Sequence, residues 1–329
     1  MPLVTPRDIL RARRRLRRLI WSTPCVHSAW LSEAAGCQVY LKLENLQHTG
    51  SFKLRGAVNK LQRLASSPDP PHILTVSAGN HGRAIAYGAK LFGMRATVVV
   101  PRSAPQTKID AIRRAGAQLQ LIGETYDEAE RAARQLAAEG NWVFVSPYND
   151  PDVIAGQGTV ALEVLEAVPD LDTLLVPVGG GGLLAGVALM AKAINPQIQI
   201  VGVQSAHTRA MYEAFRAGRL VAVEEKPTLA DGLAGNIEPG SITVPLVFRY
   251  VDDIQLVSEE SLERAMVELI AHEQLVVEGA GAVPIALLLE RAIPHSTRKV
   301  AAILTGRNVD FPLLQQLMAH RGDVGTSRR

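Results

Sequence analysis

The sequence predicts an α/β fold made of two doubly wound α/β domains with parallel-type sheets, facing each other across a cleft. From residue 38 onward, short β-branched runs alternate with longer helical patterns. Runs such as 96–100 and 173–178 are almost entirely apolar, as expected of strands that helices cover on both faces. The length of 329 residues, 47% of them hydrophobic, indicates two domains with well-buried cores.

The first expected element is a helix over 5–20, with Thr5 as its N-cap and Pro6 as its first residue. Its apolar stripe consists of Ile9, Ala12, Leu16, Leu19 and Ile20. The arginine-rich run "RARRRLRR" at 11–18 then faces solvent. No aromatic residues interleave with these arginines and no binding motif accompanies them, so we expect no nucleic-acid partner.

The other elements follow the same alternation along the chain. Strands are expected at 38–44, 73–77, 96–100, 117–122, 142–146, 173–178, 198–204 and 301–304. Helices are expected at 51–65, 80–92, 106–116, 125–139 and 182–194.

We expect the loop-rich segment 146–158, "SPYNDPDVIAGQG", to be the crossing between the domains. The division that results is a large cofactor-binding domain of residues 1–71 and 148–329, and a small substrate-side domain of residues 72–147.

Composition excludes several classes of protein. The formal net charge is only +3, and the two cysteines, Cys25 and Cys37, are too few for a disulfide framework and lack metal-ligand spacing. A reducing cytoplasm is therefore the expected location. The most apolar stretch, 174–190, is broken by Pro177 and four glycines, so we expect no membrane span.

Candidate site residues lie in glycine-rich turns between strands and helices, where helix N-termini present unpaired N–H groups to ligands. In "VSAGNHGRA", 76–84, Asn80 and His81 begin a helix that could hold an anion, although a simply capped helix is an equal alternative. A histidine such as His81 is more often structural than catalytic.

A second turn contains four consecutive glycines, Gly179 to Gly182, at the start of a helix. Close approach to a phosphate group explains the entropic cost of these glycines. A dinucleotide site is less favoured, because the next strand ends in Gln204 and Ser205 where an acidic residue should hold the ribose.

The third turn carries Thr305, whose hydroxyl either contacts a heteroaromatic nitrogen or satisfies its own turn. Elsewhere Lys53 begins a helix between Phe52 and Leu54, where desolvation and the helix dipole favour the neutral, nucleophilic amine. A phosphate cradle without a nucleotide fingerprint, together with such a lysine, points to pyridoxal phosphate held as an imine.

Six segments in order also resemble one family: "LKLENLQHTGSFKLRGA", "SAGNHG", "VPVGGGGL", "TLADGLAG", "VEGAGA" and "LTGRNVD". They are similar to the motifs of fold-type II (tryptophan synthase β-like) pyridoxal-phosphate enzymes, in the threonine/serine dehydratase branch that includes serine racemase. The resemblance extends from about residue 5 to 315.

The resemblance implies a role for each matching residue, with the cofactor in the cleft between the domains. Lys53 matches the Schiff-base lysine and catalytic base. The residues matched to cofactor binding are Phe52, Lys53, Asn80, Gly179, Gly180, Gly181, Gly182, Gly232, Glu278 and Thr305. The residues matched to holding the substrate carboxylate are Ser77, Ala78, Gly79, Asn80 and His81.

The implied activity is that of an ammonia-lyase that converts L-threonine to 2-oxobutanoate and ammonia, and L-serine to pyruvate. One alternative is a dehydratase of a larger β-hydroxy amino acid, of the kind linked to hydroxyectoine breakdown. A second is serine racemase, against which Ala78 speaks, because racemases carry a second serine at that position.

Metal-dependent members of the family carry acidic residues in the stretch matching 202–210, where this chain has Gln204 and Ala210. We therefore assign no metal site. We expect a homo-oligomer, a dimer or a tetramer, and the sequence does not decide which.

Overall fold

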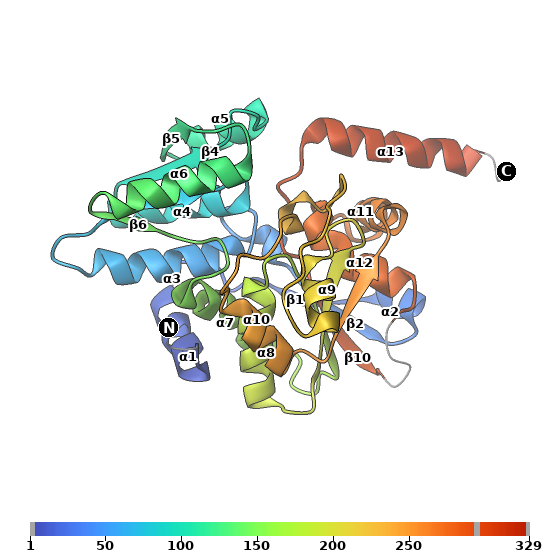
Figure 1. Cartoon of the computed structure of the whole chain (residues 1–329). Coiled ribbons are helices and arrows are strands. Elements are labelled where there is room, and N and C mark those ends of the chain that lie inside the picture. The colour runs from blue at the N-terminus through green and yellow to red at the C-terminus, as the bar shows by residue number, and fades with distance from the viewer. Residues whose placement is uncertain (1–3, 293–296, 327–329) are drawn as a thin grey trace.

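The computed structural model describes residues 4–292 and 297–326 (Figure 1). The strands are β1 Cys25–Ser28, β2 Gln38–Lys42, β3 His72–Val76, β4 Ala96–Val100, β5 Gln118–Leu121, β6 Trp142–Phe144, β7 Thr173–Pro177, β8 Gln199–Ser205, β9 Asp253–Val257 and β10 Lys299–Ile303.

Two short 3-10 helices, η1 and η2, accompany the α-helices. The helices are α1 Pro6–Leu16, α2 Ala29–Ala35, η1 Glu44–Leu46, α3 Lys53–Ala65, α4 Asn80–Phe92, α5 Gln106–Arg114, α6 Tyr126–Ala138, α7 Pro151–Ala167, α8 Gly182–Ile194, α9 Ala210–Ala217, η2 Asp231–Leu233, α10 Thr243–Tyr250, α11 Glu259–Glu273, α12 Gly279–Leu289 and α13 Phe311–Thr326.

The strands form two sheets, which confirms the predicted fold class. The larger sheet has six strands in the order β1-β2-β10-β7-β8-β9, and the smaller has four in the order β5-β4-β3-β6. Every pairing is parallel except that of β1 with β2 at the edge of the larger sheet. The smaller sheet comes from one continuous stretch of chain, 72–144, while the larger sheet is assembled from both sides of it.

Helices cover both faces of the larger sheet, which explains the strands that are apolar throughout. In β7, Leu174 and Val176 pack into the core beneath α7, α8 and α10, whereas Leu175 packs on the opposite side with α11 and α12. In β10, Ile303 joins the first core and Ala302 the second. Alternate residues of each strand are thus buried on opposite faces.

One sequence prediction about this sheet's helices was wrong. Segment 146–158 was expected to be a crossing loop, but α7 begins at Pro151, with Asp150 accepting hydrogen bonds from the backbone N–H groups of Asp152 and Val153. The glycines that suggested a loop, Gly156 and Gly158, lie inside this helix and allow close contact with its neighbours. Only residues 146–150 form the connection.

The helix α1 keeps the predicted cap and polarity but is shorter than expected. Ile9, Ala12 and Leu16 are buried, and the helix ends at Leu16 instead of continuing to residue 20. Arg18 follows in the left-handed region, with φ of 70°, a conformation that costs a non-glycine residue of order 1 kcal/mol.

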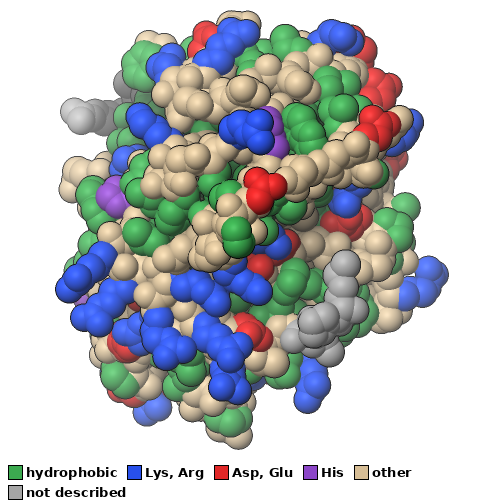
Figure 2. Space-filling model, turned by 90° about the vertical axis from the view of Figure 1, so that its left-hand side faces the viewer, with side chains coloured by type: hydrophobic (Ala, Val, Ile, Leu, Met, Phe, Trp, Pro, Cys, Tyr) green, Lys and Arg blue, Asp and Glu red, His purple; other side chains and the backbone are tan. Residues whose placement is uncertain are grey.

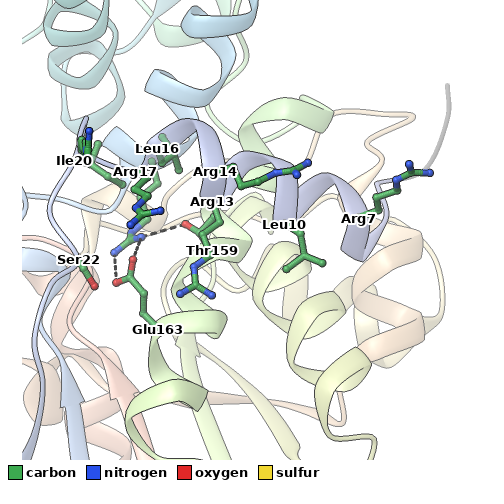
Figure 3. Close-up of a pocket in the computed structure, with 12 residues that line it drawn as sticks. Arg7, Leu10, Arg13, Arg14, Leu16, Arg17, Ile20, Ser22, Thr159 and Glu163 are labelled. Carbon is green, nitrogen blue, oxygen red and sulfur yellow. Dashed lines mark hydrogen bonds and ion pairs between the residues drawn. The ribbon is translucent and has the colours of Figure 1, made fainter.

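The arginines of α1 border an open groove. Figure 2 shows Lys and Arg side chains gathered on the lower half of the face that carries α1. Several of these arginines line a cavity of about 800 Å³ along the helix (Figure 3). Arg13 pairs with Glu166 of α7 at 2.5 Å, with both side chains about half exposed. Solvated arginines with an apolar stripe beneath them are the arrangement that the sequence predicted.

No helix within residues 4–292 and 297–326 is long and apolar enough to cross a membrane.

The helix α7 packs against α3 and α8 through glycines. A Cβ atom on Gly156 would stand 2.5 Å from the carbonyl oxygen of Arg55 and 2.6 Å from the Cα of Gly56. A Cβ on Gly158 would stand 2.8 Å from the carbonyl oxygen of Gly186 in α8. The three helices therefore touch backbone to backbone, and this contact sets where α3 begins relative to the sheet.

We predict that Gly156→Ala lowers the free energy of unfolding by about 1–3 kcal/mol, because the new methyl group meets backbone atoms that cannot rotate away. Urea unfolding followed by circular dichroism measures the change.

Gly88→Ala in α4 is the matched control. Its Cβ would meet the end of the Leu61 side chain at 3.1 Å, and a side chain can shift. This control should be neutral or slightly stabilising, and equal losses in both variants would contradict the packing explanation.

Candidate active site

The predicted site residues lie at the carboxyl ends of strands from both sheets and at the start of α3. The turn after β3 leads into α4, the turn after β7 leads into α8, and the turn after β10 carries Thr305. This placement agrees with the general rule that parallel α/β sheets bind ligands at the carboxyl ends of their strands.

Lys53 is the first residue of α3, and its amine donates a hydrogen bond to the carbonyl oxygen of Pro147 at 2.9 Å. The amine also lies 5.3 Å from the centre of the Phe52 ring. Part of the Lys53 side chain stays accessible, but protein surrounds the amine, and this desolvation lowers its pKa to about 8 against the opposing charge of Glu278. A substantial fraction of the amine is therefore neutral near pH 8.

The turn after β10 ties Lys53 to the rest of the site. The backbone N–H of Phe52 donates to the carbonyl oxygen of Thr305 at 3.0 Å, and Ser51 forms an isolated bridge with Gly306. The N–H of Glu278 donates to the carbonyl oxygen of Gly306 at 2.9 Å. Segments more than 200 residues apart in the sequence are thus joined through their backbones.

Glu278 precedes α12 and its carboxylate is buried. It accepts hydrogen bonds from the side-chain amide of Asn80 at 2.6 Å and from the backbone N–H of Asn308 at 3.1 Å. Burial, followed by the negative charge of Asp231, raises the pKa of Glu278 to about 7, although these two hydrogen bonds oppose the shift. The group therefore changes charge near neutral pH.

The turn after β3 supplies Ser77, Ala78, Gly79, Asn80 and His81, all in the positions expected from the sequence. The hydroxyl of Ser77 accepts the N–H of Gly79 at 3.2 Å, and α4 begins directly after this turn. The N–H groups in the first turn of a helix have no partner within the helix, so this end of α4 can receive an anion.

His81 is buried and neutral, as a structural histidine would be. Its Nε2 lies 3.2 Å from the carbonyl oxygen of Val145, which assigns the ring proton to Nε2. Desolvation, and then the charge of Lys53, lower the pKa of His81 to about 3. Its Nδ1 is buried without a hydrogen-bond partner in the described part of the chain.

The glycines Gly179 to Gly182 connect β7 with α8, as predicted. Gly181 has φ of 89°, in the left-handed region that favours glycine. A Cβ on Gly180 would stand 2.5 Å from the ring of Tyr148, the residue after the Pro147 that accepts the Lys53 amine. Gly179 and Gly180 stay partly accessible, so the loop packs closely on one side and presents bare backbone on the other.

Gly232 lies in η2 beside Glu278. A Cβ on Gly232 would stand 3.1 Å from the Cβ of Ala280 and 4.0 Å from the Glu278 carboxylate. The neighbouring Asp231 pairs with Lys108 of α5 at 2.6 Å, which links the elements around the two sheets.

Sequence reasoning missed two residues that organise this region. Asn308 donates to the side-chain oxygen of Asn80 at 2.6 Å and to the carbonyl oxygen of Thr49 at 2.9 Å, besides binding Glu278. Its signal was present in "TGRNVD", of which only Thr305 was chosen. Tyr148, which packs on the glycine loop, carried no signal because its partners are distant in sequence.

The structure holds no cluster of His, Cys, Asp and Glu side chains suited to a metal ion among the residues it describes.

Comparison with known proteins gives consistent results. A family model described as "Pyridoxal-phosphate dependent enzyme" matches residues 16–306. The L-threonine ammonia-lyase of Thermotoga maritima is 42% identical over 327 residues, which span 99% of this chain and 81% of that protein. The structure of maize serine racemase matches with a TM-score of 0.90 at 32% identity, covering 99% of this chain and 100% of the racemase. The structure of a bacterial catabolic relative's counterpart, the T.th. threonine deaminase, matches with a TM-score of 0.86 at 37% identity, covering 93% and 99%.

We predict that the Lys53 amine reacts with a small acylating reagent at lower pH than other lysines do. Only the neutral amine reacts, so labelling of cofactor-free protein should rise as pH increases through about 8, whereas exposed lysines rise near about 10.4. Peptide mass spectrometry across the pH range measures both midpoints in one sample. A Lys53 midpoint that coincides with that of the exposed lysines would contradict the desolvated environment.

Proposed function

The chain belongs to the pyridoxal-phosphate-dependent enzymes, and from this premise we propose that it is an ammonia-lyase acting on L-threonine and L-serine. The products would be 2-oxobutanoate or pyruvate, with ammonia. The resemblance to the threonine/serine dehydratase branch is confirmed by the relatives that match nearly the whole chain. The observation that carries the proposal is the desolvated Lys53 amine, held beside Glu278 and the turn of Thr305.

The residues present fit this cofactor. Lys53 offers an amine whose pKa is lowered to about 8, as a nucleophile toward an aldehyde requires. The partly accessible glycine backbone at Gly179 and Gly180, followed by the N-terminus of α8, suits a phosphate group. When bound, pyridoxal phosphate supplies an aldehyde that a lysine amine can engage and a conjugated ring that withdraws electrons from the substrate's α-carbon.

Other side chains would surround the ring. Phe52 would pack by its face, and Asn80, Gly232 and Glu278 would line its edge. Thr305 would face the ring nitrogen with a hydroxyl in place of a carboxylate, so this position provides no anion to keep that nitrogen protonated.

The turn of residues 77–81 would hold the substrate carboxylate. The first-turn N–H groups of α4 point their donors outward from the helix end, and neutral His81 adds no competing charge. Binding the carboxylate at this end would orient the α-proton toward the Lys53 side of the site, which contributes to the rate through positioning.

Lys53 would act as the general base. Its neutral amine would accept the α-proton at Nζ, while the Pro147 carbonyl, 2.9 Å away, keeps the nitrogen oriented. The same ammonium group could then donate a proton to the departing β-hydroxyl, so that water leaves and the amine returns to its neutral form. A positioned acid and base of this kind contributes roughly 10²- to 10⁴-fold to the rate.

We predict that Lys53→Ala lowers kcat for L-threonine by roughly 10²- to 10⁴-fold or more and removes the visible absorbance of the bound cofactor. Product formation measured as 2-oxobutanoate, together with an absorbance spectrum of the purified protein, tests both effects. Lys90→Ala, an exposed lysine of α4, is the control and should keep both. Threonine turnover at the original rate by the Lys53 variant would rule out the proposal.

Serine racemase is a second candidate, because the maize enzyme matches the whole chain with a TM-score of 0.90. Ala78 opposes it. Its methyl group packs with the apolar cluster of Val98 and Ile109 and has no proton to donate. The face of the substrate opposite Lys53 would then lack the acid that racemisation needs.

We therefore predict that L-serine gives pyruvate with little D-serine, and that Ala78→Ser raises the share of D-serine. A general acid is worth roughly 10²-fold or more, so the gain should be easily measured by chiral chromatography. D-serine formed by the unaltered protein as fast as pyruvate would reverse the assignment in favour of the racemase.

A further inference from the structure

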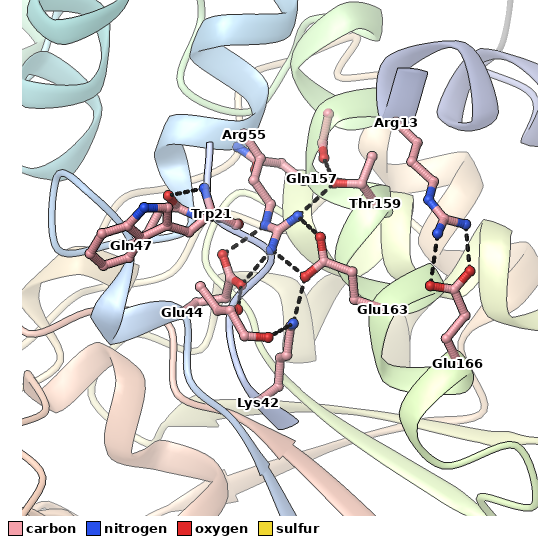
Figure 4. Close-up of polar contacts among 12 residues, drawn as sticks. Arg13, Trp21, Lys42, Glu44, Gln47, Arg55, Gln157, Thr159, Glu163 and Glu166 are labelled. Carbon is pink, nitrogen blue, oxygen red and sulfur yellow. Dashed lines mark hydrogen bonds and ion pairs between the residues drawn. The ribbon is translucent and has the colours of Figure 1, made fainter. Parts of the chain in front are cut away.

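A buried cluster of four charged side chains lies against the first turn of α3 (Figure 4). Arg55 stands at its centre. Its Nε and Nη2 donate to Glu44 at 2.8 and 2.7 Å, and its Nη1 and Nη2 donate to Glu163, both at 2.7 Å. Since Glu44 belongs to η1 and Glu163 to α7, one planar guanidinium joins three elements.

Lys42 completes the cluster and balances its charge. The Lys42 amine donates to Glu163 at 2.5 Å and to the carbonyl oxygen of Thr23 at 2.5 Å. The side chains of Lys42, Glu44 and Arg55 are no more than 1% exposed, and that of Glu163 is 16% exposed. Burial by itself would lower the pKa of Arg55, but the two carboxylates outweigh it and raise the pKa, so the guanidinium stays charged.

A neutral buried cluster of this kind contributes more to geometry than to stability. Apolar side chains of the same volume often stabilise a core as well as buried ion pairs do. A guanidinium with two bidentate carboxylates, in contrast, holds its partners in one orientation, because the donors form a rigid planar fork.

The helix α3 needs such a constraint. It meets α7 at Gly56 and Gly156, where no side chains interlock to prevent rotation. Successive residues of a helix turn by about 100°, so the side chains of Lys53 and Arg55 leave α3 about 200° apart, on nearly opposite sides. A rotation that moved Lys53 away from Pro147 would also pull Arg55 out of its fork.

We propose that Arg55 is a positioning residue, which fixes the rotation of α3 and thereby holds the Lys53 amine in its desolvated place against the Pro147 carbonyl. Glu44 and Glu163 are the two anchors of this clamp. The kinetic consequence rests on the proposed lyase function, whereas the effect on the Lys53 amine does not.

Arg55→Lys tests the proposal, because it keeps the charge but removes the fork. In cofactor-free full-length protein, the pH midpoint for acylation of Lys53 should rise from about 8 toward the value of about 10.4 for an exposed lysine, as water reaches the amine. In the holoenzyme, kcat for L-threonine should fall roughly 10- to 100-fold, with a smaller change in KM, since Arg55 does not contact the carboxylate-binding turn.

Arg15→Lys is the matched control. Arg15 of α1 donates to Asn59 of α3 at 3.1 Å, so it contacts the same helix outside the cluster. This variant should leave the acylation midpoint and kcat unchanged. If it shifts both as much as Arg55→Lys does, general loosening of α3 is the cause and the proposal is overturned.

Glu163→Gln provides a second test in case Arg55→Lys does not fold. Glu163 is the anchor nearest solvent, at 16% exposed, so its replacement is the milder change. A smaller rise of the Lys53 midpoint supports the clamp, and a midpoint that stays near 8 in a folded clamp variant overturns it. Absence of lyase activity in the unaltered protein would instead refute the proposed function, and the acylation midpoints would still decide the role of Arg55.

Discussion

The removal of the Lys53 amine from water is the constraint around which the rest of the structure is arranged. Desolvation penalises the ammonium form, and the pKa falls to about 8 although Glu278 lies close enough to oppose the shift. Maintaining this environment requires α3 to begin at one place and in one orientation. The backbone contact of Gly56 with Gly156, the pairing of Phe52 with Thr305 and the Arg55 clamp each restrict that beginning from a different direction.

The same low-dielectric environment acts on the neighbouring ionisable groups. Burial lowers the pKa of His81 to about 3 and raises that of Glu278 to about 7, so both shifts favour the uncharged form, as for Lys53. Few fixed charges then compete for a ligand that carries its own phosphate or carboxylate. The helix N-termini of α4 and α8 offer anions a positive potential that does not depend on protonation. This division between neutral side chains and helix ends suits proton transfer near neutral pH.

Local sequence patterns predicted much of the fold but little of what joins its parts. The apolar runs of β4 and β7 and the glycine loop at 179–182 were identified because their signals lie within a few residues. The start of α7 was missed because Gly156 resembles a loop residue until its contact with Gly56 is seen. The predicted site residues do come together in space, although their roles toward a cofactor stay predictions. The clamp was invisible because Arg55 and Glu163 are 108 residues apart, and Asn308 contacts Asn80 across 228.

The most direct test of the central claim is to reduce the purified protein with borohydride and map its peptides by mass spectrometry. Reduction makes a cofactor bound to an amine permanent, so its position can be read from the modified peptide. The account predicts pyridoxal phosphate on Lys53 and on no other lysine. A cofactor found on a different residue, or an unmodified residue 53 in protein that turns over threonine, would contradict it.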